Sequence, residues 1–196
     1  MRSVRGMRVV AAVVFAVSVV GCGLGQGGVP GAPEPFVGIE LPPRPRDVSV
    51  RDVDPCDLLT EAQRAEIGLE TPPLLTPDDG SVFSEGPEPL CTANAFDPRA
   101  FGVGVAVAYD GLGIGALTGR PVSSDLTVIE VQGFPAVLAR PQRDPLFCQV
   151  LVDLAPGSAL NVQFREGGRR TISQDDLCDG AVQVADAAMA TLLSLS

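Results

Sequence analysis

Nine residues in the middle of the chain alternate strictly between bulky and small side chains, and this pattern constrains the fold more than any other. Gly or Ala stands between the bulky residues, which are Phe101, Val103, Val105, Val107 and Tyr109. A period of two predicts a β-strand. We expect the bulky side chains to face a core and the small residues to allow close approach on the other side.

Further strands and two flanking helices complete the expected fold. Strands are predicted at 89–95, 126–131, 136–140, 147–154 and 159–164, separated by Gly-containing turns. A helix is expected from Pro55 to Ile67, with Leu58, Leu59 and Ala62 on its apolar side. A second should follow Ser173, with Leu177 and Leu192 on one apolar stripe. The order predicts an α+β fold, an antiparallel sheet with N-terminal and C-terminal helices packed on one face.

The first 21 residues have the features of a bacterial export signal. A basic head precedes an apolar run from Val9 to Val20, and Gly21 then precedes Cys22. About 12 apolar residues are too few to span a bilayer but typical of a signal peptide. Gly21-Cys22 resembles a lipobox, in which cleavage exposes a cysteine that receives a lipid. The alternative is an ordinary secretory signal in which Cys22 is incidental.

These features predict three regions. Residues 1–21 are the lipoprotein signal, 22–53 a Gly/Pro-rich tether, and 54–196 the folded domain. The expected location is the extracytoplasmic face of the cell membrane, with the lipid on Cys22 as the membrane contact.

Four cysteines remain after Cys22. An even number of cysteines in an exported domain predicts two disulfides, for which three connectivities exist. We favour Cys56–Cys91 and Cys148–Cys178, because each pair closes a neighbouring stretch of chain. Each loop would contribute about 3–4 kcal/mol in the chain-entropy model. A zinc site is the alternative, but it favours CxxC pairs and these cysteines are isolated.

Charge and missing residue types exclude several functions. The net charge is −10, and it becomes −13 without the signal, which holds three of the 14 basic residues and no acid. Such a surface disfavours nucleic acid as a partner. The chain has no His and no Lys, so the usual general base and Schiff-base chemistry are missing. We therefore expect no enzyme activity and no cofactor.

Four acidic clusters are candidates for catalytic or calcium sites. They are Asp52 with Asp54, Asp78 with Asp79, Glu85 with Glu88, and Asp175 with Asp176. Each stands beside Gly, Pro or a helix start, where acids commonly form turns and caps. None extends to a complete calcium-binding loop. We assign neither a catalytic nor a metal site.

The segment 111–115 is the most suggestive place for a ligand. Its three glycines could form a mobile lip over an apolar cavity, with Leu112 and Ile114 as contacts and Tyr109 presenting a hydroxyl. The simpler interpretation is a flexible surface connection, with Tyr109 ending a strand and its ring half buried.

The chain resembles an actinobacterial lipoprotein family known as domain of unknown function 3558. The resemblance rests on the string from Asp54 to Thr60, on Cys91, on the segment from Gly133 to Val152, and on Cys178. It covers about residues 54–195. One departure is Ala93, where family members often carry an aromatic residue. The resemblance implies an envelope lipoprotein with two disulfides, no established activity and a Mog1/PsbP-like architecture.

Taken together, these features predict a lipid-anchored, non-enzymatic binding module. Its ligand would be a small hydrophobic molecule or an envelope component. The alternative is a pocketless protein-interaction or sensor domain, and an enzyme would require a cleft with converging acids.

Overall fold

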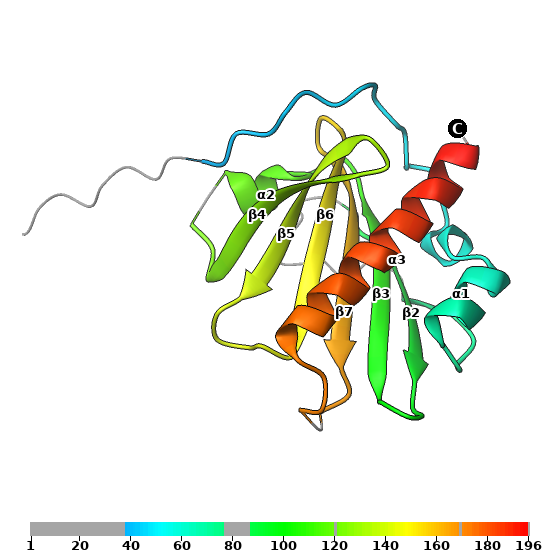
Figure 1. Ribbon diagram of the computed structural model, residues 1–196. Coiled ribbons are helices and arrows are strands. Elements are labelled where there is room, and N and C mark those ends of the chain that lie inside the picture. Colours follow the sequence, from blue (N-terminus) through cyan, green and yellow to red (C-terminus); the bar gives the residue numbers. More distant parts are fainter. Residues whose placement is uncertain (1–37, 77–86, 120, 169, 196) are drawn as a thin grey trace, which may run out of the picture. The chain divides into compact units, whose positions relative to one another are not determined.

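A computed structural model describes residues 38–76, 87–119, 121–168 and 170–195, and these form an α+β domain (Figure 1). A 3₁₀ helix, Pro55–Leu58, precedes three α-helices: α1 (Glu61–Ile67), α2 (Gly115–Thr118) and α3 (Gln174–Leu195). The strands are β1 (Leu74–Thr76), β2 (Leu90–Ala95), β3 (Phe101–Ala108), β4 (Ser124–Val131), β5 (Phe134–Pro141), β6 (Phe147–Ala155) and β7 (Ser158–Glu166). No helix in these ranges is long and apolar enough to cross a membrane.

The strands form one antiparallel sheet in the order β1-β2-β3-β7-β6-β5-β4. β3 pairs with β7 along its whole length, from Phe101 opposite Glu166 to Ala108 opposite Ala159. The predicted antiparallel sheet with a C-terminal helix is therefore confirmed.

Helix α3 crosses one face of this sheet, which we call the first face (Figure 1). The bulky residues of β3 point toward this helix, as their alternation predicts, and Val107 is fully buried. Close packing depends on small residues of α3. A Cβ atom at Gly180 would lie 2.9 Å from the ring of Phe164, so the backbone of the helix packs directly on this ring.

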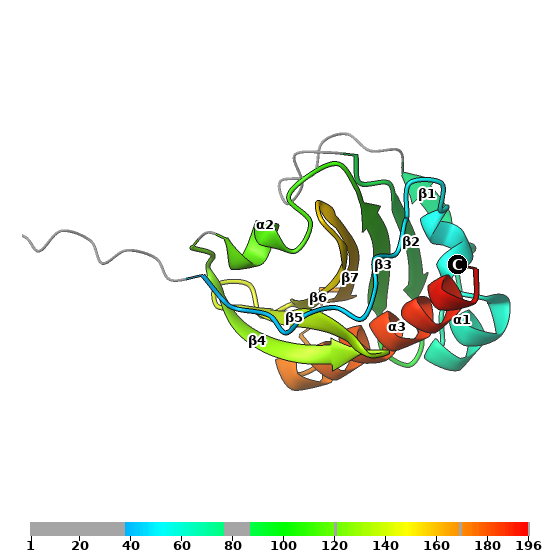
Figure 2. The same ribbon diagram turned by 90° about the horizontal axis from the view of Figure 1, so that it is seen from above.

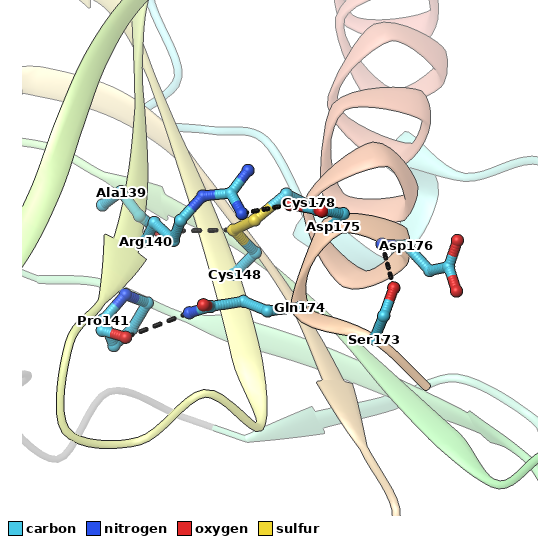
Figure 3. Close-up of polar contacts among 9 residues, drawn as sticks. All are labelled: Ala139, Arg140, Pro141, Cys148, Ser173, Gln174, Asp175, Asp176 and Cys178. Atoms are coloured by element: carbon cyan, nitrogen blue, oxygen red, sulfur yellow. Dashed lines mark hydrogen bonds and ion pairs between the residues drawn. A yellow bond between two sulfur atoms is a disulfide. The ribbon is translucent and has the colours of Figure 1, made fainter. Parts of the chain in front are cut away.

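The first turn of α3 is fastened to the sheet by several contacts (Figure 3). The disulfide Cys148–Cys178 joins β6 to the helix, and both cysteines are buried. Gln174 donates a hydrogen bond of 3.0 Å to the carbonyl of Pro141, and Arg140 pairs with Asp175. The Ser173 hydroxyl accepts from the Asp176 amide at 3.1 Å, which is the capping bond predicted from the sequence.

The opposite, second face carries a smaller apolar cluster. Leu117 of the short helix α2 packs there against Val137, Leu151 and Ala159. Figure 2 shows α2 and α3 on opposite sides of the sheet. Helices therefore contact both faces. The sequence did not predict α2, whereas Leu58 of the N-terminal helix and the apolar side of α3 share the core of the first face, as expected.

The N-terminal helix differs from its prediction. The residues from Pro55 to Ile67 form two short helices separated by Leu59, because Thr60 starts a new helix with a complete capping box. Leu58 is buried, but α1 contains no buried residue and Ala62 is exposed. The second disulfide, Cys56–Cys91, ties this region to β2 and confirms the favoured pairing.

Residues 38–53, which we call the strap, pack on the domain rather than serving wholly as tether. Val48 and Val50 are each 1% exposed and belong to the core, and the Val48 amide donates to the Leu154 carbonyl at 2.9 Å. Arg44 pairs with the buried Asp153 at 2.6 Å. Part of the segment predicted as tether, which ends at residue 53, thus packs on the domain. The alternation Val48-Ser49-Val50 was the overlooked signal.

Two carboxylates fix the loops at one end of the sheet. Glu70 accepts hydrogen bonds from the amides of Asp97 and Phe96, each 2.9 Å, and these bonds lower its pKa. Burial raises the pKa of Glu166, but hydrogen bonds from the backbone and hydroxyl of Thr171 outweigh it and leave the pKa below its ordinary value of 4.5. Both loops are therefore held by ionised side chains.

We expect the free energy of unfolding to fall as the pH drops below about 4.5, because protonation of Glu70 and Glu166 weakens the bonds that their carboxylates accept. A depressed folded-state pKa gives stability that is complete above the unfolded-state value and is lost below it. Urea unfolding between about pH 3 and 6 measures this dependence. Glu166→Gln should flatten the curve, whereas Glu130→Gln, at an exposed position of β4, should not. Identical slopes for all three proteins would contradict this account.

Candidate functional site

A buried chain of polar side chains crosses the second face. Gln149 of β6 donates to the Oδ1 of Asn161 on β7 at 2.8 Å, and the Nδ2 of Asn161 donates to Glu88 at 2.6 Å. Their exposed fractions are 2%, 4% and 6%. The second carboxylate oxygen of Glu88 is also buried and has no hydrogen-bond partner among the described residues. Polar side chains so fully removed from water are unusual in a core that serves stability alone.

Beside this chain lies an open groove with a volume of about 230 Å³. Two cross-strand rows form it. In one row Thr92, Gly104 and Gln163 are aligned, and in the next row Asn94 and Arg165 flank Gly102. In each row a glycine of β3 lies between a polar residue of β2 and a polar residue of β7. The glycines of β3 thus form a floor, while side chains of β2 and β7 form the walls.

The floor is open because two positions of β3 carry no side chain. A Cβ atom at Gly102 would lie 2.8 Å from the Oδ1 of Asn94, and one at Gly104 would lie 3.2 Å from the Cδ1 of Leu90. Any larger residue would displace the walls or fill the groove. The glycines of the alternating strand therefore open the second face while the valines fill the first.

Arg165 is the only charged residue among the described ones that line this groove. It is exposed, and its guanidinium lies over the ring of Phe147, 5.0 Å from the centroid. No ion pair of Arg165 occurs within the part of the chain that the structure describes. This contact with the ring restrains the guanidinium, and its N–H groups remain available at the edge of the groove.

Tyr109, predicted as a ligand contact, lies elsewhere. It is half-buried at the end of β3, and Arg51 of the strap lies over its ring at 5.4 Å. Arg51 also pairs with Asp110 at 2.5 Å. Tyr109 lines a separate depression of about 290 Å³ between the strap and the turn from β6 to β7. These contacts fasten the strap to the domain.

Leu112 and Ile114 are not brought together with Tyr109 in that depression. Ile114 packs on the cluster around Leu117, and Leu112 is half-buried. Their segment is pinned to the turn from β6 to β7, since Gly111 donates to the Gly157 carbonyl at 3.1 Å. Gly113 has a φ of +54°, and a Cβ there would lie 2.8 Å from the Ser158 nitrogen.

Other cavities differ widely in size. An open depression of about 360 Å³ beside the strap is lined by Asp52, Asp54 and Asp57 among others. The apolar crevice beside Cys56–Cys91, which Ala93 lines, has a volume of about 10 Å³, space for about one water. Asp54 caps the Cys56 amide at 2.8 Å. Within the described ranges, no group of three or more His, Cys, Asp or Glu residues is arranged to hold a metal ion.

Several sequence-predicted residues lie outside the described ranges, namely Cys22, Asp78, Asp79 and Glu85. The groove was missed because its residues come from three strands that are not consecutive along the chain. One signal was present. The alternate residues Asn161, Gln163 and Arg165 of β7 are polar, while the residues between them are apolar or buried.

Replacing Asn161 by Ala should destabilise the domain by about 2–4 kcal/mol, because it leaves two buried polar groups, on Gln149 and Glu88, without their partner. Chemical denaturation of the purified protein measures this loss. Asn94→Ala is the matched control, since Asn94 is exposed on the same face and should change stability by less than about 0.5 kcal/mol. Equal losses for both variants would show that the buried chain has no special role.

Comparisons with known proteins give one match. The family described as protein of unknown function (DUF3558) matches residues 17–191, a range that includes Cys22 and the four disulfide cysteines. No curated protein and no solved structure matches significantly. The chain belongs to the DUF3558 family of proteins of unknown function.

Proposed function

We propose that the protein is an exported lipoprotein, anchored through Cys22, whose domain is a non-enzymatic binding module for a component of the cell envelope. The basic head, the apolar run and Gly21-Cys22 support the anchor. The two disulfides support export, because such bonds persist mainly outside the cytoplasm.

The observation that carries the binding role is the glycine-floored groove. It is open, polar side chains of β2 and β7 stand along a lining that is otherwise apolar, and a buried hydrogen-bonded chain joins β6 to β7 beside it. A fold maintained only for stability has no need of paired glycines opposite polar residues. The groove therefore favours a polar envelope component over a small hydrophobic ligand, and the crevice beside Cys56–Cys91 is too small for a lipid chain.

A non-enzymatic role is supported by the residue types at hand. The chain has no His or Lys to activate a hydroxyl nucleophile. Three of the described acids are engaged in other tasks: Asp175 pairs with Arg140, Glu166 holds a loop, and Glu88 belongs to the buried chain.

The strap gives the anchor a mechanical consequence. Fifteen residues separate Cys22 from residue 38, where the strap begins. That length reaches at most about 50 Å when fully extended. Arg44 and Val48 fasten the strap to β6, so the domain would stay close to the membrane surface while its groove faces the envelope space.

A protein-interaction domain is the second candidate, and exposed apolar residues favour it. Leu74 and Leu75 are 66% and 43% exposed on the edge strand β1, and Phe96 is 63% exposed at the turn between β2 and β3. Edge strands can pair with a partner's strand. Native mass spectrometry of the lipidated protein from its own envelope separates the candidates. A reproducible added mass supports the groove, and a bare mass favours a protein partner.

The anchor is tested by Cys22→Ala. This variant should move from the membrane fraction to the soluble extracytoplasmic fraction, because it lacks the thiol that would carry the lipid. Gly21→Ala is the matched control: it keeps a small residue before the cysteine and should remain in the membrane fraction. Immunoblots of fractionated cells measure both. Continued membrane association of Cys22→Ala would refute the anchor while leaving the binding role open.

A further inference from the structure

We propose that the groove of the second face recognises an anionic group, a carboxylate or a phosphate, on a small polar molecule, and that Arg165 binds this group. The inference rests on the proposed binding function and names the ligand class for the same site. It is carried by the charge, the geometry and the size of the groove.

Charge is the first argument. Acidic residues outnumber basic ones by 24 to 14 in this chain, so a random surface groove would be lined mainly by carboxylates. Among the described residues, Arg165 and no acid line this groove, the other lining residues being Leu90, Thr92, Asn94, Gly102, Val103, Gly104 and Gln163. In a protein of net charge −10, such a position is where an anion meets attraction rather than repulsion.

Geometry is the second argument. The Arg165 guanidinium lies over the Phe147 ring, which restrains the side chain beside the groove, and its N–H groups have no ion-pair partner among the described residues. A planar guanidinium donates two parallel hydrogen bonds to a carboxylate or a phosphate. Pre-ordering by the ring reduces the conformational entropy that binding would otherwise consume. Arg143, by contrast, is exposed in the turn between β5 and β6 and lies outside the groove lining.

Size and wall chemistry define the rest of the ligand. A volume of about 230 Å³ lies below the usual 300–1,000 Å³ of sites for drug-sized molecules, so the groove fits a unit the size of one sugar or amino acid. Thr92, Asn94 and Gln163 supply hydroxyl and amide groups, which match hydroxyls on the ligand. The glycine floor allows a flat ring to approach the backbone of β3.

The test uses the full lipidated protein in detergent and ligand-observed NMR titrations with four probes: glucuronate, glucose 1-phosphate, glucose and inorganic phosphate. We expect glucuronate or glucose 1-phosphate to bind with a dissociation constant of about 1 mM, and glucose at least tenfold more weakly. Whichever of the two anionic sugars binds more tightly indicates whether the natural group is a carboxylate or a phosphate. Inorganic phosphate should bind more weakly than the tighter-binding anionic sugar, because it lacks the sugar hydroxyls that would contact Thr92, Asn94 and Gln163.

Three variants locate the interaction. Arg165→Gln should weaken binding of the anionic sugar at least tenfold. Arg165→Lys should retain part of the affinity, since lysine keeps the charge but cannot donate two parallel hydrogen bonds. Arg143→Gln is the matched control and should bind within twofold of the parent protein. Thermal unfolding of each variant verifies that the fold is intact.

The possible failures are distinguishable. If glucose binds as tightly as the anionic sugars, or if Arg143→Gln weakens binding as much as Arg165→Gln, the anion inference is wrong and the binding function stands. If no probe binds but native mass spectrometry finds an added mass on the envelope-derived protein, the anion inference is again wrong. If no probe binds and the mass is bare, both the inference and the groove-binding function are overturned.

Discussion

The attachment of α3 to β6 is the constraint on which the rest of the structure depends. The disulfide Cys148–Cys178 is buried where the helix begins, and Ser173, Gln174 and Asp175 add a cap, a hydrogen bond and an ion pair around it. The helix is thereby held against the sheet. Small residues such as Gly180 let its backbone pack on side chains of the sheet. With one face sealed in this way, the apolar core is complete on that side.

Because α3 seals the first face, the second face can carry features that would otherwise be unfavourable. A buried amide chain and two glycines in a strand interior reduce stability unless other contacts offset them. The strap contributes such contacts at the other end of β6, where Val48 and Arg44 fasten it. The polar groove therefore lies on a sheet that is rigid for other reasons. This division of the sheet into a stabilising face and a binding face unites the fold with the proposed function.

Much of the fold could be predicted from local patterns, and the candidate site could not. Strict alternation located β3, the Ser173 cap located α3, and the sequence proximity of the cysteines indicated their pairing, all of which the structure confirms. The edge strand β1 was missed because three exposed residues leave no periodic signal. The groove was missed because one of its walls comes from β7, whose pairing with β3 joins segments far apart in the sequence. Leu112 and Ile114 looked flexible from their glycines, yet Gly113 is required for tight packing on a turn.

Native-state hydrogen exchange tests the central claim most directly. If α3 and its attachment to β6 hold the first face together, amides in the middle of α3 and those of β6 and β7 should exchange only through global unfolding, with one common free energy. Selective reduction of Cys148–Cys178 should then lower that free energy for helix and strands together. Fast exchange throughout α3 with full protection of β6 would contradict the account, because the sheet would then be stable without the helix.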